Sequence, residues 1–282
     1  MGCGSSSDCG GCPSQSSGCG GGAPQQPQDL TAPLHELSSV KHVIGVVSGK
    51  GGVGKSSVTS LMAITMARKG YKVGILDADI TGPSIPKMFG IKEKAYADEI
   101  GMYPVKSKGG IDVMSVNLLL ENDTDPVLWR GPILGNVVKQ FYTDVLWEEL
   151  DYLIIDMPPG TGDVALTVMQ SIPINGIVMV SVPQDMVSMI VAKAVNMVKK
   201  LNIEIIGLVE NMSYIQCPDC SKKIKLFDGD DTEKFLSEMN LELLGELPMT
   251  REIIEITHNG VSEVSDELDV VLNDIVSKIN NK

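Results

Sequence analysis

From about Val43 onward, short apolar runs alternate with longer segments of helical periodicity. Several runs are rich in Val and Ile with little polar alternation, as is typical of strands buried on both faces. They predict strands at Val43–Val47, Lys72–Leu76, Ile111–Val116, Tyr152–Ile155, Ile177–Val182, Ile205–Val209 and Leu243–Leu247. Helical stretches lie between most of them, at Ser56–Arg68, Gly131–Leu146 and Met186–Lys200. This alternation predicts an α/β fold with a mainly parallel sheet and helices on both faces.

The end of the chain carries one further helical pattern. Its apolar residues fall on a single helix face, namely Val264, Leu268, Val271, Leu272, Ile275 and Ile279. The polar residues of this segment are largely acidic, which anionic lipid would repel. We therefore expect this helix to pack on the fold and not to bind a membrane.

The first 28 residues consist almost entirely of Gly, Ser, Gln, Pro and Cys. Such a segment buries too little apolar surface to offset the entropy of ordering, so we expect a disordered tail unless a metal organises it. The sequence thus divides into a Cys-rich tail over residues 1–30 and a nucleotide-binding domain over residues 40–282. A C-x-x-C insert is expected near residues 217–220.

The composition of the chain argues against two classes of binding partner, nucleic acid and membrane. The formal net charge is −13, and an acidic chain is repelled by phosphate backbones, so nucleic acid is not an expected partner. No apolar run reaches the roughly 18 residues of a membrane-spanning helix. The first basic residue is Lys41, so neither a secretory signal nor a transit peptide is expected. These features predict a cytoplasmic protein that binds neither nucleic acid nor membrane.

A phosphate-binding loop follows the first strand. The segment Val43-Ile-Gly-Val-Val-Ser-Gly-Lys-Gly-Gly-Val-Gly-Lys-Ser56 matches G-x-x-x-x-G-K-[ST] between a strand and a helix. Glycines let backbone N–H groups close around phosphate oxygens, and the helix N-terminus adds positive potential. We expect Lys55 to reach the β- and γ-phosphates and the Ser56 hydroxyl to ligate Mg²⁺. The predicted nucleotide-binding residues here are Gly49, Lys50, Gly51, Gly52, Val53, Gly54, Lys55, Ser56 and Ser57.

A second strand, Asp151-Tyr-Leu-Ile-Ile-Asp156, ends in a carboxylate and runs into the loop Met-Pro-Pro-Gly-Thr-Gly-Asp163. This arrangement is typical of a Walker B strand followed by a loop that senses the γ-phosphate. Asp156 is therefore expected to hold Mg²⁺ through water.

The second lysine of the loop, Lys50, is not required by an ordinary P-loop. Lys-Gly-Gly-x-Gly-Lys-Ser resembles the deviant Walker A motif of the MinD/ParA/nitrogenase-iron-protein class. The resemblance implies a homodimer in which Lys50 reaches the partner subunit's nucleotide. It also implies that Asp79, after the strand that ends at Asp77, orients or activates the attacking water. Lys50, Lys55 and Asp79 are thus the expected catalytic residues, while Asp77 is equally compatible with a supporting role.

Four further segments resemble the Mrp/ApbC family of iron–sulfur cluster carrier ATPases. They are Asp77-Ala-Asp-Ile-Thr-Gly-Pro-Ser84, Trp129-Arg-Gly-Pro132, Asp156-Met-Pro-Pro-Gly-Thr-Gly-Asp163 and Val209-Glu-Asn-Met-Ser213. The resemblance runs from about residue 40 to the end of the chain. It implies that Asn211 and the backbone near Pro248 contact the adenine of ATP.

Cys217-Pro-Asp-Cys220 follows the last of these segments. Thiolates suit iron–sulfur clusters and also Zn²⁺, so the ligand type alone does not choose between them, and a redox pair is a third interpretation. The family resemblance implies that a dimer brings two such pairs together as four thiolates around one bridging [4Fe–4S] cluster.

The other four cysteines, Cys3, Cys9, Cys12 and Cys19, lie in the tail. One branch of the family carries a four-cysteine N-terminal cluster site with a C-x-x-C centre, although its first gap is longer than the one here. A second [4Fe–4S] cluster, zinc binding and a labile cysteine tail remain open for these residues.

The resemblance as a whole implies a homodimeric ATPase that carries an iron–sulfur cluster to target apoproteins, with slow ATP hydrolysis. Two alternatives share the same nucleotide site: a MinD/ParA-type positioning ATPase and an ATP-driven reductase related to the nitrogenase iron protein. The first would bind membrane or DNA, and the second has cluster cysteines far apart in sequence, unlike the C-x-x-C here.

Overall fold

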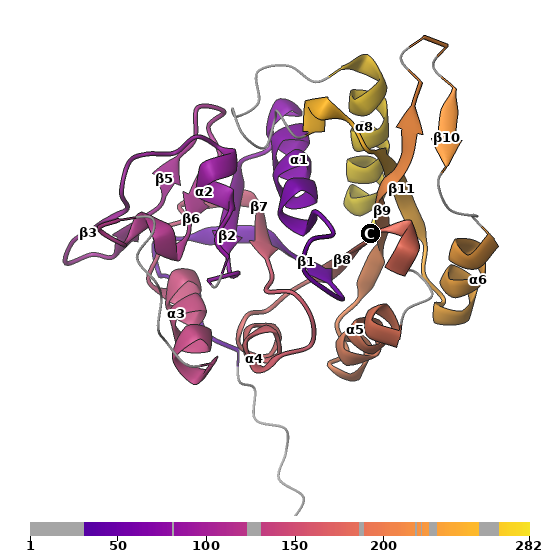
Figure 1. Ribbon diagram of the computed structural model, residues 1–282. Coiled ribbons are helices and arrows are strands. Elements are labelled where there is room, and N and C mark those ends of the chain that lie inside the picture. The colour runs from indigo at the N-terminus through magenta and orange to yellow at the C-terminus, as the bar shows by residue number, and fades with distance from the viewer. Residues whose placement is uncertain are drawn as a thin grey trace, which may run out of the picture. The chain divides into compact units, whose positions relative to one another are not determined.

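The centre of the fold is a sheet in which the strands follow the order β10-β9-β8-β1-β7-β2-β6-β5, with β11 beside β9 (Figure 1). In this computed structural model the described residues are 31–80, 82–122, 131–185, 189–217, 219–220, 222–225, 230–253 and 265–282. The strands of the sheet are β1 (Ser39–Ser48), β2 (Val73–Asp77), β5 (Val105–Lys106), β6 (Asp112–Met114), β7 (Glu149–Asp156), β8 (Gly176–Ser181), β9 (Ile205–Gln216), β10 (Lys223–Lys225) and β11 (Leu243–Pro248). All pairings are parallel except β5 with β6 and β10 with β9. A separate hairpin is formed by β3 (Tyr96–Ala97) and β4 (Met102–Tyr103).

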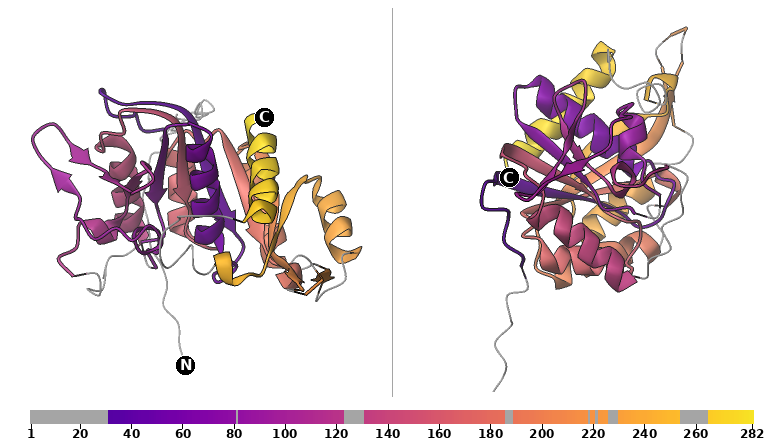
Figure 2. Two further views of the ribbon diagram at one scale, coloured as in Figure 1. Left: turned by 90° about the horizontal axis from the view of Figure 1, so that it is seen from above. Right: turned by 90° about the vertical axis from the view of Figure 1, so that its left-hand side faces the viewer.

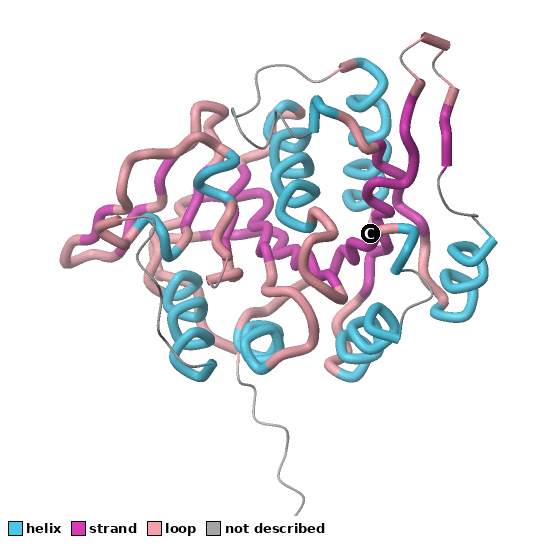
Figure 3. Tube along the Cα trace, viewed as in Figure 1, coloured by secondary structure: helices cyan, strands magenta, loops and turns pink. Residues whose placement is uncertain are grey.

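Helices cover both faces of this sheet (Figures 2 and 3). One layer contains α1 (Lys55–Arg68), α2 (Ile85–Met88) and α8 (Asp266–Asn280). The other contains α3 (Gly131–Thr143), α4 (Asp163–Ser171), α5 (Met189–Lys200) and α6 (Asp230–Met239). The described residues also contain two short 3₁₀ turns, Val116–Leu118 and Pro183–Asp185. Two apolar clusters, one between the sheet and each helical layer, form the core. The predicted mainly parallel α/β fold with helices on both faces is confirmed.

The strand register brings three strand ends to one edge of the sheet. Val46 of β1 and Asp77 of β2 are both register partners of Asp156 in β7. Because these strands are parallel, their carboxyl ends and the loops that follow them lie together, which is where open α/β sheets bind ligands.

Several predicted boundaries need correction; the first strand, for example, begins at Ser39 and not at Val43. The helix expected to reach Leu146 ends at Thr143, because Val145 bridges to Met102 and the Leu146 N–H donates to the Met102 carbonyl. The strand expected at Ile111–Val116 is shorter, since Val116 begins a 3₁₀ turn. The strand expected at Ile205–Val209 continues to Gln216.

The predicted C-terminal amphipathic helix is present as α8. Leu268, Leu272, Ile275 and Ile279 are buried in the same core cluster as α1. Ser265 caps the helix, its hydroxyl accepting from the Leu268 N–H at 3.4 Å. Val264, from the predicted apolar face, and Met186, the predicted start of the preceding helix, lie outside the described residues.

Candidate functional site

The loop Gly49–Gly54 joins the end of β1 to the start of α1. Gly52 and Gly54 have φ angles of 83° and 79°, in the left-handed region that favours glycine. A Cβ atom on Gly54 would overlap the side-chain amide of Asn211, whereas one on Gly52 would meet nothing within 4 Å. The first-turn N–H groups of α1 have no carbonyl partner within the helix, so this helix end favours an anion.

A cavity of about 230 Å³ opens over this loop. It is lined by seven of the nine residues predicted from the motif, and by Asp79 from the segment after β2. The lining residues are Ser48, Lys50, Gly51, Gly52, Gly54, Lys55, Ser56, Ser57, Asp79, Gly82, Ser84, Met88 and Pro159. The other two motif residues, Gly49 and Val53, do not line it, and Val53 is buried in the core beside α1.

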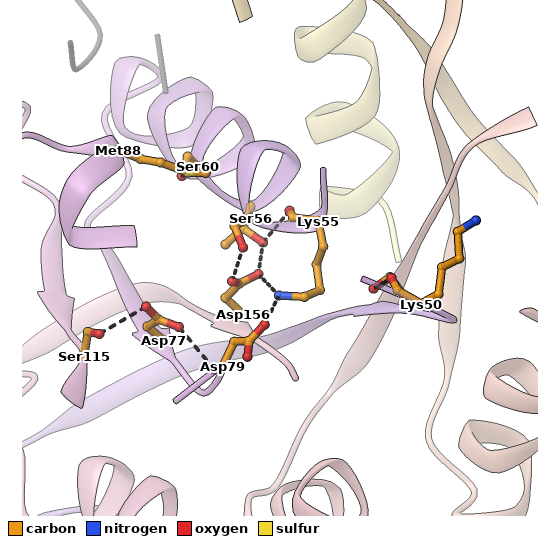
Figure 4. Close-up of polar contacts among 11 residues, drawn as sticks. Lys50, Lys55, Ser56, Ser60, Asp77, Asp79, Met88, Ser115 and Asp156 are labelled. Atoms are coloured by element: carbon orange, nitrogen blue, oxygen red, sulfur yellow. Dashed lines mark hydrogen bonds and ion pairs between the residues drawn. The ribbon is translucent and has the colours of Figure 1, made fainter. Parts of the chain in front are cut away.

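Asp156 is the hub of the polar contacts beneath the cavity (Figure 4). Its Oδ2 accepts from the Ser56 hydroxyl at 2.6 Å, and its Oδ1 accepts from the Thr59 hydroxyl at 2.8 Å. Lys55 Nζ lies 2.8 Å from Asp156 Oδ1 and 3.9 Å from Asp79 Oδ2. Although Lys55 Nζ is buried and ion-paired, none of its contacts has hydrogen-bond geometry. A buried ammonium with unused donor capacity at the mouth of a phosphate loop is suited to phosphate oxygens.

Asp77 lies behind this group. Its carboxylate accepts from the Ser115 hydroxyl at 3.1 Å and from the Asp79 N–H at 3.2 Å. Burial raises the pKa of Asp77 well above its ordinary value, and the charge of Asp156 raises this pKa further. Asp77 therefore organises the turn that carries Asp79, which corresponds to the supporting role considered from the sequence.

The side chain of Lys50 points in a different direction from that of Lys55 (Figure 4). It is exposed and extends away from the Lys55–Asp156 pair. The Ser48 hydroxyl donates to the Lys50 carbonyl at 2.9 Å and so fixes the backbone at the start of the loop.

The two predicted adenine-contacting positions lie on neighbouring strands. Asn211 in β9 is buried, and its Nδ2 donates to the Val53 carbonyl of the phosphate loop at 2.9 Å. Pro248 ends β11 and is the register partner of Tyr214 in β9. Asn211 is thus a structural support of the loop as well as a predicted nucleotide contact.

Cys217 and Cys220 lie in the turn that joins β9 to β10. Both are free thiols, and the Cys217 N–H donates to the Lys222 carbonyl at 3.0 Å. Hydrogen bonds from the Asp219 and Cys220 N–H groups, and from the Cys220 side chain, lower the pKa of Cys217 below its ordinary value. Within the described part of the chain, no group of three or more His, Cys, Asp or Glu side chains is arranged to hold a metal. The turn therefore offers two thiolates, half of the usual ligand set of a [4Fe–4S] cluster.

The remaining predicted positions lie outside the described residues: Cys3, Cys9, Cys12 and Cys19 of the tail, and Trp129 and Arg130 of one family segment. Sequence reasoning missed Thr59 and Ser115. The position of Thr59, one helical turn after Lys55 on α1, is a signal that could have revealed it. None of the helices within the described ranges is long and apolar enough to cross a membrane.

The strand–loop–helix with Lys55, Ser56 and the facing Asp156 defines a P-loop nucleotide-binding protein. The family model described as ParA, NUBPL iron-transfer P-loop NTPase, matches residues 39–282. The chain belongs to this family, and the resemblance to the Mrp/ApbC iron–sulfur carriers is confirmed.

Individual relatives agree with this assignment. An iron-sulfur cluster carrier protein of Clostridium perfringens is 53% identical over 234 residues, covering 80% of this chain and 82% of that protein. The cytosolic Fe-S cluster assembly factor CFD1 of Saccharomyces cerevisiae is 41% identical, covering 83% of each chain. A solved nucleotide-binding protein from Archaeoglobus fulgidus, in complex with ADP, matches with a TM-score of 0.69 and 41% identity, covering 78% of this chain and 86% of that one.

Proposed function

We propose that this protein is an ATP-dependent iron–sulfur cluster carrier that delivers its cluster to apoproteins and hydrolyses ATP slowly. The observation that carries the proposal is that β9 connects the phosphate loop to the cysteine turn. This strand bears Asn211, bonded to the phosphate loop, and leads directly into Cys217. A strand that contacts the phosphate loop and then leads into a thiol pair suits a nucleotide-regulated carrier. The names of the relatives favour this function over a positioning ATPase or a reductase.

Different residues of the site would bind Mg²⁺, the phosphates of ATP and the attacking water. Hydroxyl and carboxylate oxygens suit Mg²⁺, and Ser56 Oγ and Asp156 Oδ2 lie only 2.6 Å apart, so these two residues would hold the ion directly or through water. Mg²⁺ there would neutralise charge on the phosphates. Lys55 binds the β- and γ-phosphates, and Asp79 orients the attacking water.

A second copy of the chain completes the carrier. The turn provides two thiols, whereas a [4Fe–4S] cargo takes four thiolates, so two copies supply one full set. The outward direction of Lys50 supports the same arrangement, because a side chain that leaves its own site is able to reach a partner's nucleotide (Figure 4). We propose a homodimer with ATP between its subunits.

Delivery is an exchange of ligands. Each iron–thiolate bond to Cys217 or Cys220 that breaks is replaced by a bond to a thiolate of the client, and no electron is transferred. The lowered pKa of Cys217 favours its thiolate form, which is the form that binds iron. A cytoplasmic setting suits such chemistry, because it keeps free thiols reduced. The second cluster predicted for Cys3, Cys9, Cys12 and Cys19 is a further part of the proposal.

The test uses a full-length chain in which serine replaces Cys3, Cys9, Cys12 and Cys19, so that the cysteines left to bind a cluster are Cys217 and Cys220. We expect this parent to take up iron and sulfide anaerobically, to absorb near about 400 nm as thiolate-bound clusters do, and to activate an apoprotein. Adding Cys217→Ser and Cys220→Ser should abolish delivery and leave ATP affinity within about twofold, because neither cysteine lines the phosphate cavity. Delivery by this variant at the parent's rate would refute the carrier role of the turn.

A further inference from the structure

A second buried polar cluster lies outside the phosphate site. Glu210 of β9 is only 3% exposed, and a buried carboxylate is costly unless hydrogen bonds satisfy it. Its Oε2 accepts from the Ser213 hydroxyl at 2.6 Å, and its Oε1 accepts from the Thr232 hydroxyl of α6 at 2.9 Å. Both oxygens are thus used, and they join two elements that are separate in the sequence.

The same cluster extends to β10 and β11. Glu246 of β11 is the register partner of Glu210, and its Oε1 lies 3.2 Å from the Ser213 hydroxyl. Lys225, the last residue of β10, places Nζ 2.6 Å from this Oε1. The Ser213 hydroxyl therefore lies within hydrogen-bond distance of both carboxylates, and Lys225 supplies the positive charge beside them. Burial raises the pKa of Glu246, but the hydrogen bond and charge of Lys225, together with the hydrogen bonds of Ser213 and Glu210, hold this pKa below its ordinary value.

Glu210 lies on β9 between the segment that contacts the phosphate loop and the segment that leads to the cysteines. Successive residues of a strand point to opposite faces, so Asn211 turns toward the phosphate loop and Glu210 toward α6. Beyond Ser213, the strand leads to Cys217, and Lys225 lies on the returning strand of the same hairpin. The cluster thus binds both strands of the cysteine hairpin at its base.

We propose that Glu210 is a positioning residue for the cysteine pair. Through Ser213 and Thr232, and through the Glu246–Lys225 pair, it fixes the β9–β10 hairpin relative to the strand segment that carries Asn211. This inference rests on the proposed function, since it is the use of Cys217 and Cys220 as cluster ligands that makes their placement matter.

The test measures how fast Ellman's reagent labels Cys217 and Cys220 in the full-length chain in which Cys3, Cys9, Cys12 and Cys19 are serine. Glu210→Ala removes the hydrogen bonds from Ser213 and Thr232 and should raise the labelling rate of the half-buried Cys217 by about tenfold or more. Glu210→Gln keeps one acceptor and gains one donor, so it should restore the rate to within about threefold of the parent. The circular dichroism spectrum of the reconstituted cluster should change in Glu210→Ala and recover in Glu210→Gln.

Two controls separate positioning from loss of charge and loss of stability. Glu238→Ala removes the same charge from an exposed position on α6 and should label at the parent's rate. Val276→Ala creates a cavity in the opposite helical layer and should lower global stability without accelerating the labelling. If Glu210→Ala does not fold, Ser213→Ala, which breaks the link between the two carboxylates, is measured in its place.

The outcomes are distinct. Labelling of Glu210→Ala at the rate of Glu238→Ala, or acceleration by Val276→Ala to the same extent, overturns the positioning role. A parent protein that takes up no iron contradicts the proposed function instead, whatever the labelling rates are.

Discussion

Asp77 and Asp156 are register partners at the carboxyl ends of adjacent parallel strands, and their side chains are 1% and 0% exposed. Lys55 is the cation that faces them both, at 2.8 Å from Asp156 and with an attractive effect on Asp77. Two buried carboxylates and one ammonium leave an excess of negative potential in a site that is built to bind phosphates. Burial and then the charge of Asp156 raise the pKa of Asp77 well above its ordinary value, which favours its protonated form and so reduces this excess.

Asp77→Asn tests this imbalance. A carboxyl whose pKa is raised on folding binds a proton more tightly in the native state, so the free energy of unfolding falls as pH rises from the ordinary pKa to the raised one. Asparagine removes this loss, its oxygen accepts from the Asp79 N–H and its NH₂ group donates to the Ser115 hydroxyl, so we expect a gain of about 1 kcal/mol or more at neutral pH. Urea unfolding of the nucleotide-free protein at several pH values measures both effects. Parallel pH profiles for the two proteins would contradict the shifted pKa.

Asp79→Asn should abolish most ATP hydrolysis without loss of structure. The substitution preserves size but weakens the control of the attacking water, and we expect a fall in kcat of about 10²–10³-fold. Lys55→Ala should abolish hydrolysis as well, but it leaves Asp156 without its cation and so lowers stability too. Phosphate release measures the rate, with Asp274→Asn, at an exposed position of α8, as the control. Full turnover by Asp79→Asn would remove Asp79 from the catalytic residues.

Lys50→Ala should separate nucleotide binding from association of the subunits. Because the Lys50 side chain leaves its own site, ADP affinity should change by less than about threefold, whereas ATP-dependent dimers should be lost. Sedimentation velocity with ATP and with ADP measures the association. Lys108→Ala, at another exposed lysine, is the matched control. Dimers of normal stability in Lys50→Ala would argue against a role of Lys50 across the interface.

Gly54→Ala and Gly52→Ala form a pair that distinguishes backbone strain from a steric clash. Both positions have positive φ, so each alanine should lower the free energy of unfolding by roughly 1–2 kcal/mol. Only at Gly54 does the new methyl group overlap the Asn211 amide, so Gly54→Ala should lose more nucleotide affinity than Gly52→Ala, by about tenfold or more. Isothermal titration with ADP measures the difference. Equal affinities for the two variants would show that the clash is relieved without moving Asn211.

Deleting residues 1–28 should leave a folded protein that binds ATP. Thr31–Lys282 forms one compact unit, and Ala32 is buried, with its N–H donating to the Ser171 carbonyl. The deleted residues are mostly Gly, Ser and Gln and offer little apolar surface to a core. Far-ultraviolet circular dichroism and nucleotide titration check both properties. An unfolded deletion variant would show that these residues are needed for folding.

The sequence allowed the buried parallel strands to be predicted to within a few residues, because their environment selects continuous Val and Ile runs on both faces. β9 was predicted only to Val209, since Glu210, Asn211 and Ser213 interrupt its apolar pattern. These polar residues belong in the strand because their partners arrive from elsewhere: the Val53 carbonyl, the Thr232 hydroxyl and Glu246. No local pattern contains that information.

The candidate site shows the same division. The motif predicts Lys55 and Ser56, because a phosphate loop demands those residues at fixed spacing. Ser115 and Thr59 were missed because the contacts with Asp77 and Asp156 depend on which strand and helix pack beside them. A motif specifies the residues that meet the ligand, whereas tertiary packing selects those that hold them in place.

The two parts of β9 are held by different numbers of hydrogen-bonded neighbouring strands. Residues 208–210 are bonded to both β8 and β11, whereas Ile215 and Gln216 pair with the three-residue strand β10. Amide protons of residues 208–210 should exchange with solvent only when the whole sheet unfolds. Those of Ile215 and Gln216, near the cysteines, should exchange through local opening of the hairpin. In the proposed carrier, the thiols at the weakly paired end would rearrange around an incoming acceptor while the hydrogen bonds of residues 208–210 stay intact.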